Sequence, residues 1–166
     1  MKILHRYEGK NLEVLKNQCL DELSVKENEL YIFKSEEEAG LFKGKKYILE
    51  VMTKEEIINE IRRFINELAK NMNIEINSEI KFEDNNITVL LVTNNNSIMI
   101  GKDGKTLNAI QIILRQYMSE LNKFGLRIIV DIGNYKNKKL KNLEYEVKKI
   151  CEEVLKTKVE VKLDPM

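Results

Sequence analysis

The sequence is poor in the residues from which most catalytic and metal sites are built. Among its 166 residues it has no tryptophan, one proline, two cysteines and a single histidine, His5. A structural zinc site takes four Cys or His ligands, and two cysteines with one histidine are too few. His5 has no plausible nucleophile or carboxylate constellation to work with. We therefore expect no catalytic residue, no metal, no cofactor and no small-molecule substrate, so that the chain is not an enzyme.

Long apolar stretches are missing as well. No run approaches the roughly 20 apolar residues that a helix needs to span a bilayer. The first eight residues, Met1–Glu8, lack the apolar core of a signal peptide. We therefore expect a cytoplasmic protein. Cys19 and Cys151 both fall on the apolar stripes of predicted helices, so they are expected to be buried free thiols rather than metal ligands.

Positive charge is concentrated in the second half of the chain. Residues 1–92 carry 14 basic and 18 acidic side chains, whereas residues 93–166 carry 14 basic and 9 acidic ones. A protein that holds a polyanion should gather cations where it touches that partner. A solvated surface without a partner explains the same distribution, and charge alone does not decide between the two.

The spacing of apolar residues predicts an α+β fold made of three units. Residues 1–52 are expected to form a small βαββ domain, with a strand over 2–7, a helix over 11–23 and two strands around the connection 35–46. That connection contains Gly40-Leu41-Phe42-Lys43-Gly44, an apolar tip between glycines. Such a tip either docks on a protein or membrane surface or folds back onto its own sheet.

Residues 53–133 follow a different order, namely helix, strand, strand, short helix, glycine loop, long helix and strand. Thr53 with Glu56 three residues later is the capping-box pattern that opens a helix. The Asp-Asn-Asn cluster at 84–86 predicts a turn between two strands. The whole order, α-β-β-α-α-β, is that of a type II KH domain, a module that binds single-stranded nucleic acid.

The glycine loop of this unit is the best candidate for a binding site. Two glycines three residues apart let the backbone turn tightly, so that a sugar-phosphate chain can approach it. The helix that follows offers free N–H groups and the positive end of its dipole. The predicted RNA contacts are seven consecutive residues: Ile100, Gly101, Lys102, Asp103, Gly104, Lys105 and Thr106.

The loop has two competing interpretations. GxxG also occurs as a plain strand-to-helix turn, and Asp103 brings a negative charge to a loop meant to approach phosphate. Gly104-Lys105-Thr106 resembles the end of a P-loop, but the first glycine of that motif would fall at Met99. The phosphate cradle of an NTPase is therefore not expected.

Residues 134–166 are predicted to form a helix and a closing strand. The helix should bury one apolar face, and the strand should contain Val159, Val161 and Leu163. Four lysines cluster where the helix begins: Lys136, Lys138, Lys139 and Lys141. They are either a second stripe of phosphate contacts or an exposed helix start. Lysines near a helix N-terminus oppose its dipole and add nothing to its stability, which mildly favours the binding role.

Three stretches of the sequence resemble the bacterial Jag family, also called KhpB or EloR, the SpoIIIJ-associated RNA-binding proteins. Residues 98–111 resemble its signature I-G-K-x-G-x-T-L-x-A-[IL]-Q, which is more specific than GxxG alone. Residues 131–135 resemble its exit into a final domain, and the βαββ unit is similar to its Jag-N domain. That final domain usually carries an Arg-x-x-x-His motif, which would begin near residue 166. The unit 134–166 is therefore expected to be incomplete, and no residue of that motif is carried over.

The resemblance implies a single-stranded RNA-binding protein and post-transcriptional regulator linked to cell elongation, envelope or sporulation control. It also implies pairing with a small single-KH protein of the KhpA type or with a second copy. An association of the N-terminal domain with membrane insertase machinery is a further implication. The alternative is an adaptor or scaffold in which the KH domain serves dimerisation and not RNA.

Overall fold

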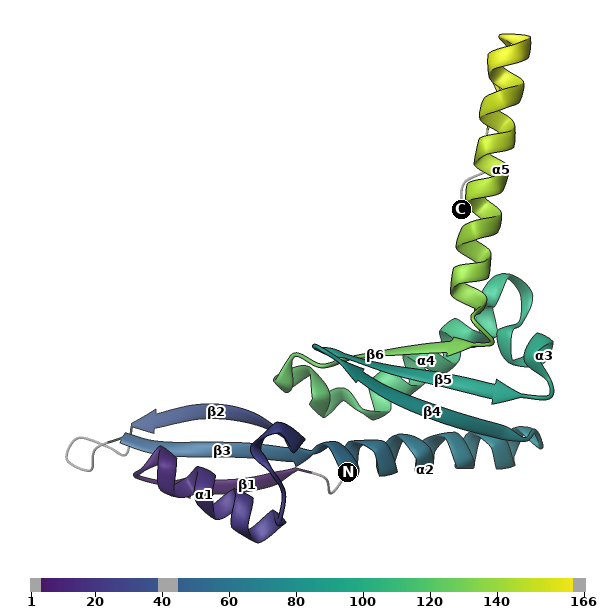
Figure 1. Cartoon of the computed structure of the whole chain (residues 1–166). Helices are drawn as coiled ribbons and strands as arrows, with labels where there is room; N and C mark the ends of the chain where they lie inside the picture. The colour runs from purple at the N-terminus through teal and green to yellow at the C-terminus, as the bar shows by residue number, and fades with distance from the viewer. Residues whose placement is uncertain (1–3, 39–44, 163–166) are drawn as a thin grey trace.

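The computed structural model describes residues 4–38 and 45–162, which form two three-stranded sheets with their helices and a long C-terminal helix (Figure 1). The strands are β1 (His5–Gly9), β2 (Leu30–Glu38), β3 (Lys45–Thr53), β4 (Ile76–Glu83), β5 (Asn86–Thr93) and β6 (Arg127–Ile132). The α-helices are α1 (Leu12–Leu23), α2 (Lys54–Met72), α3 (Asn96–Ile100), α4 (Lys105–Tyr117) and α5 (Tyr135–Thr157). Short 3-10 turns are η1 (Glu27–Glu29), η2 (Lys102–Gly104) and η3 (Ser119–Phe124). The predicted α+β class is confirmed.

The N-terminal sheet has the order β1-β3-β2, with both pairs antiparallel. Helix α1 packs on it through the buried Leu15 and Cys19. The expected connection 35–46 is wrong at its ends, because β2 runs to Glu38 and pairs there with Lys45. Opposite charges across the strands favour this extension, and Lys45 Nζ lies 3.3 Å from Glu36 Oε2. The apolar tip at 40–44 lies outside the described residues.

The second sheet has the order β4-β5-β6 and gives the element order predicted for a KH domain. Strands β4 and β5 are antiparallel, and β5 and β6 are parallel. Helix α2 packs along β4 and α4 along β6. Their buried faces meet the strands in one core, to which α2 gives Ile57, Ile61 and Ile65 and α4 gives Leu107, Ile110 and Leu114. The apolar stripes predicted for both helices are therefore the faces they bury.

The start of α2 joins the two sheets. Glu56 N donates to Thr53 Oγ1 at 3.1 Å and Thr53 N donates to Glu56 Oε2 at 3.0 Å, so the predicted capping box is present. His5 Nε2 lies 2.6 Å from Glu56 Oε1. Burial acts to raise the pKa of the Glu56 carboxyl, but the bonds from His5 and Thr53 outweigh it and hold that pKa below its usual range.

Aromatic contacts hold the N-terminal sheet against the second unit. Tyr31 stacks on Phe82 with ring centroids 6.1 Å apart, and Phe33 meets Phe124 edge-on at 6.4 Å. In Figure 1 the N-terminal sheet accordingly lies beside the KH-like unit, at the end away from α5.

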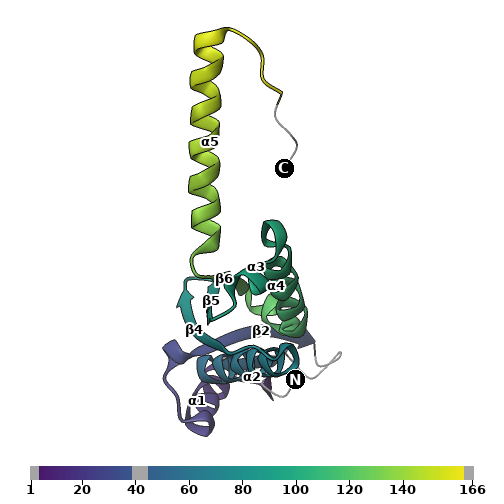
Figure 2. The same ribbon diagram turned by 90° about the vertical axis from the view of Figure 1, so that its right-hand side faces the viewer.

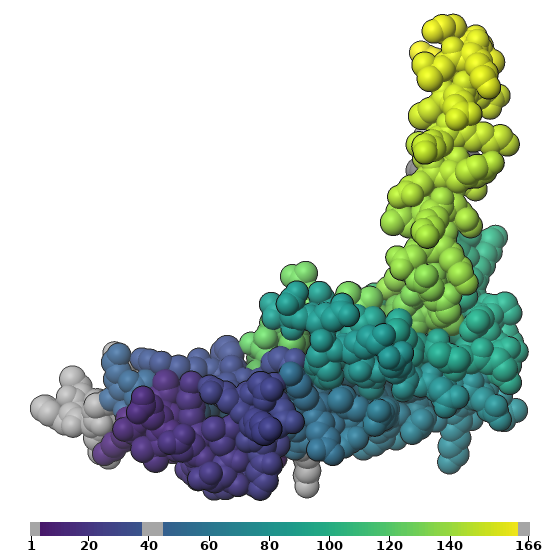
Figure 3. Space-filling model, viewed as in Figure 1, coloured from purple at the N-terminus to yellow at the C-terminus, as the bar shows by residue number. Residues whose placement is uncertain are grey.

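Helix α5 contradicts the expected packing of the last unit. It rises away from both sheets (Figures 1 and 2), and its side chains stand clear of the body over most of its length (Figure 3). No residue of α5 is buried; Leu140 is 54% exposed and Cys151 is exposed. Residues 158–162 form no strand, and Leu163 lies outside the described residues. An amphipathic pattern fixes which face is apolar, but burial also needs an opposing element, and the described chain supplies none above the first turns.

None of the described helices is both long enough and apolar enough to cross a bilayer.

Candidate nucleic-acid interface

The glycine loop joins α3 to α4 through three residues with positive φ. Gly101 has φ +69°, Asp103 +57° and Gly104 +83°. Gly101 N donates to Ser97 O at 2.9 Å, which ends α3, and Gly104 N donates to Gly101 O at 3.3 Å. Aspartate tolerates the left-handed region better than most residues. The loop conformation therefore gives a local reason for Asp103 that is separate from any contact with RNA.

Both glycines are required by close neighbours as well as by φ. A Cβ on Gly101 would lie 2.2 Å from Thr106 Oγ1, and one on Gly104 would lie 2.8 Å from Tyr135 Cε1. Both distances are far below van der Waals contact. The corner is thus packed on its inner side by Thr106 and by the first residue of α5.

The seven residues predicted to contact RNA divide into two groups. Lys102, Asp103 and Lys105 are exposed. The other four build the corner: Ile100 packs against the core, Gly104 is buried under Tyr135, and Gly101 and Thr106 contact each other. The two lysines stand at the N-terminal end of α4, where the helix dipole also attracts anions.

The lysines at the start of α5 face this loop in part. Lys139 Nζ donates to Asp103 O at 3.0 Å, and Lys136 Nζ donates to Gln111 Oε1 at 2.8 Å. Burial lowers the pKa of Lys136, an effect that nearby Asp131 opposes. Lys138 and Lys141 are exposed. Lys136, Lys138 and Lys139 line the cleft described below, and Lys141 lies outside it.

Two polar residues that hold α5 in place were not singled out from the sequence. Asp131 Oδ1 accepts from Lys136 N at 3.3 Å, close to the first turn of α5. Gln111 Oε1 accepts from Val130 N at 3.0 Å as well as from Lys136. Both fall inside the stretches that resemble the Jag family, so the resemblance was the signal that could have identified them.

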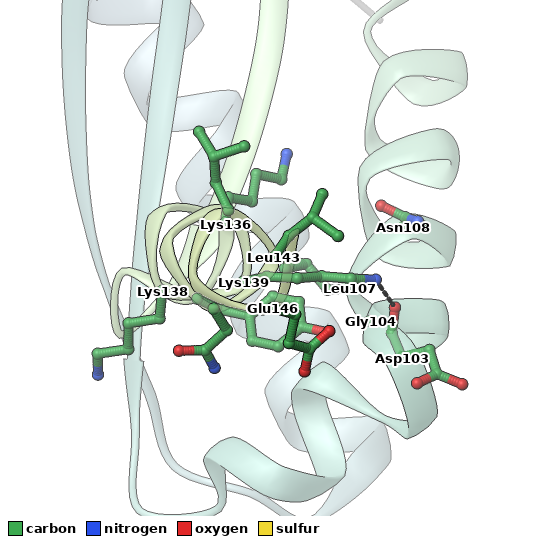
Figure 4. A pocket seen from close by; sticks show the side chains of 12 residues that line it. Asp103, Gly104, Leu107, Asn108, Lys136, Lys138, Lys139, Leu143 and Glu146 are labelled. Atoms are coloured by element: carbon green, nitrogen blue, oxygen red, sulfur yellow. Dashed lines mark hydrogen bonds between the residues drawn. The ribbon is translucent and has the colours of Figure 1, made fainter. Parts of the chain in front are cut away.

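A cleft of about 860 Å³ separates the loop and the start of α4 from α5 (Figure 4). One wall consists of Asp103, Gly104, Leu107 and Asn108. The other wall is the first three turns of α5: Tyr135, Lys136, Lys138, Lys139, Leu140, Asn142, Leu143 and Glu146. The volume falls within the range of about 300–1,000 Å³ typical of ligand sites. Lysine, amide and leucine side chains together can contact phosphates, base edges and base faces.

Comparison with known proteins agrees with this architecture. The family model described as "KhpA/KhpB, KH domain" matches residues 59–132, from within α2 to the end of β6. The RNA-binding protein KhpB of Clostridium symbiosum is 27% identical over 163 residues, which cover 95% of this chain and 73% of that relative. Residues 59–132 are thus similar to the KH domain of KhpA and KhpB, and the chain is similar along most of its length to a protein named RNA-binding protein KhpB.

Two further proteins with the printed name RNA-binding protein KhpB are similar over different lengths. The RNA-binding protein KhpB of Bacillus subtilis (strain 168) is 26% identical over 95% of this chain and 78% of its own length. That of Lactiplantibacillus plantarum is 25% identical over 60% of this chain and 31% of its own length. The match to the KH-domain model ends at residue 132, so one wall of the cleft is built by residues outside the matched range.

Within residues 4–38 and 45–162, no group of three or more His, Cys, Asp or Glu side chains is placed to hold a metal ion.

Proposed function

We propose that this chain binds single-stranded RNA at the corner formed by Gly101–Gly104 and the start of α4. The observation that carries the proposal is the shape of the loop. Close neighbours leave no room for a Cβ at Gly101 or Gly104, while Lys102 and Lys105 stay exposed. Similarity to proteins named RNA-binding protein KhpB supports the same conclusion. Ile100, Gly101, Gly104 and Thr106 shape the corner, and the lysines attract phosphate.

The chemistry is that of a KH loop, which clamps about four nucleotides by their backbone. The glycines let the loop take its positive φ values beside the N-terminus of α4, which adds a favourable dipole. Lys136, Lys138, Lys139 and Lys141 are proposed as secondary phosphate contacts. Asp103 opposes binding, because its carboxylate is exposed in the loop. At such an exposed site one charge is worth about 0.5–1 kcal/mol, so binding should persist and depend on salt.

The test is fluorescence anisotropy of a labelled eight-nucleotide single-stranded RNA titrated with the 166-residue chain at several salt concentrations. We expect affinity to fall steeply with salt, because phosphate contacts release counterions. Lys102→Asp should weaken binding about tenfold or more, since it places two carboxylates side by side in the loop. The matched control is Lys10→Asp, which makes the same charge change at an exposed lysine of the N-terminal unit.

Three results would argue against RNA binding at this corner. They are no binding at low salt, no response to Lys102→Asp, and an equal loss with Lys10→Asp. The last would mean that only overall charge matters.

The second candidate function is an adaptor whose KH domain mediates dimerisation. It is favoured by two adjacent isoleucines on the outer face of α4, Ile112 at 64% and Ile113 at 55% exposed. Light scattering should then show a dimer that Ile112→Asp dissociates. RNA affinity unchanged by Lys102→Asp, together with such a dimer, would decide for the adaptor.

The cellular part of the proposal comes from the family resemblance. We propose a cytoplasmic regulator acting after transcription in cell elongation, envelope or sporulation control. Its protein partner would be a KhpA-like single-KH protein or a second copy, and its N-terminal domain would contact membrane insertase machinery. Crosslinking in cells followed by sequencing of the bound RNA, with Lys102→Asp as the control, tests the RNA part directly.

A further inference from the structure

The start of α5 has features that its own stability does not explain. Its first three turns expose Leu140 at 54% and bring several lysines close to the N-terminus, where cations oppose the helix dipole. Asn134, the residue before the helix, makes no side-chain capping bond. An exposed leucine among cations adds nothing to the stability of the helix. A ligand with an apolar face and negative charge would therefore suit this segment.

The same segment is held firmly against the glycine loop. Tyr135 lies over Gly104, and Lys139 Nζ is bonded to Asp103 O, as the dashed line in Figure 4 shows. An ammonium group has three donors, so this bond leaves two for a phosphate at the loop. Any strand gripped at the loop therefore lies within reach of α5.

The cleft beyond this contact has the mixed lining that a nucleotide needs. Leu107 at its α4 wall is only 1% exposed, so the apolar contact to a base comes from Leu140 and Leu143 on the α5 wall. Asn108 and Asn142 offer amides, which can donate to and accept from base edges. The carboxylates of Asp103 and Glu146 would repel phosphate, so the sugar-phosphate chain should follow the lysines while the base points inward.

We infer that the cleft between α4 and α5 is a second nucleotide subsite, into which the RNA strand continues from the glycine loop. This inference rests on the proposed RNA binding and extends it. The footprint becomes longer than the four nucleotides of a KH loop, and the segment after the KH domain supplies one wall. Continuity with the loop and charge complementarity identify the occupant as the same RNA strand.

The test compares four- and eight-nucleotide RNAs of one sequence by anisotropy at fixed salt. An eight-nucleotide strand gains about fivefold statistically from its five registers on a four-nucleotide site. The variant is Leu140→Ala/Leu143→Ala, since alanine keeps helix propensity while it removes apolar contact. The control is Leu155→Ala, on the same helix beyond the cleft and 69% exposed.

We expect the double variant to lower the affinity for the eight-nucleotide RNA about five- to tenfold. Its affinity for the four-nucleotide RNA should stay within about twofold of the wild type. Leu155→Ala should change neither affinity. Circular dichroism should show that all three proteins keep the same helix content. An unchanged eight-nucleotide affinity, or equal losses for both lengths, would overturn the subsite. If the wild-type chain binds neither RNA, the proposed function itself fails, and that outcome is distinct from the other two.

Discussion

Helices α4 and α5 form the two walls of one cleft, yet they are built in opposite ways. Helix α4 buries Leu107, Ile110 and Leu114 in the core of its sheet. Helix α5 is longer and buries no residue. Bonds and contacts at its first turns, from Lys136 and Lys139 and from Tyr135, connect it to the rest of the molecule. Helix α4 therefore carries stability and loop geometry, whereas the start of α5 is free to contact a ligand.

The largest expected effect is on stability. Leu114→Ala should lower the free energy of unfolding by about 3 kcal/mol, because it leaves a cavity under α4. A truncation to alanine on α5, Val147→Ala, should lower the free energy of unfolding by less than about 0.5 kcal/mol, because Val147 is 41% exposed. Urea denaturation followed by circular dichroism measures both. Similar losses for the two variants would show that α5 contributes to stability as much as α4 does.

Alanine substitutions at two glycines separate the effect of backbone strain from that of close packing. Gly101→Ala should lower the free energy of unfolding by about 1–3 kcal/mol from its positive φ, and Thr106 must also move. RNA affinity should fall with it, since the corner is reshaped. Gly125→Ala is the matched control, because Gly125 has φ +70° but no atom within 4 Å of its absent Cβ. It should share part of the destabilisation and keep full RNA affinity.

A smaller effect should appear in RNA binding alone. Lys139→Gln keeps a donor for Asp103 O but removes the charge, so RNA affinity should fall about three- to tenfold and the salt slope by about one contact. The free energy of unfolding should stay within about 0.5 kcal/mol. Lys149→Gln, further along α5, should change neither quantity. If Lys149→Gln lowers the RNA affinity as much as Lys139→Gln does, the position of the lysine on α5 does not matter.

The smallest expected effect is a gain. Asp103→Asn keeps a residue that tolerates the left-handed conformation and removes the loop's negative charge. RNA affinity should rise about two- to fivefold, which corresponds to one exposed charge. Anisotropy at two salt concentrations measures it, and the gain should shrink as salt increases. A loss of affinity would mean that the carboxylate itself contacts the RNA.

Sequence reasoning succeeded where local pattern and burial act together. The capping box at Thr53, the turn at 84–86 and the buried stripe of α4 are each set by neighbouring residues, and the structure has all three. The order of elements around the glycine loop was predictable for the same reason.

The same reasoning failed where burial depends on what lies opposite. Cys151 sits on an apolar stripe as regular as that of Cys19, but only Cys19 has a sheet to pack against. The bond of Lys139 to Asp103 O and the contact of Tyr135 with Gly104 join residues 36 and 31 positions apart, and no local pattern encodes them.

The most direct measurement of the central claim is a ¹⁵N NMR titration of the chain with an eight-nucleotide single-stranded RNA. The amides of Gly101, Gly104 and Lys105 should shift first and most, followed by those of residues 139–143 on α5. Shifts confined to Ile112 and Ile113 or to the N-terminal sheet, with the glycine amides unmoved, would contradict RNA binding at this corner.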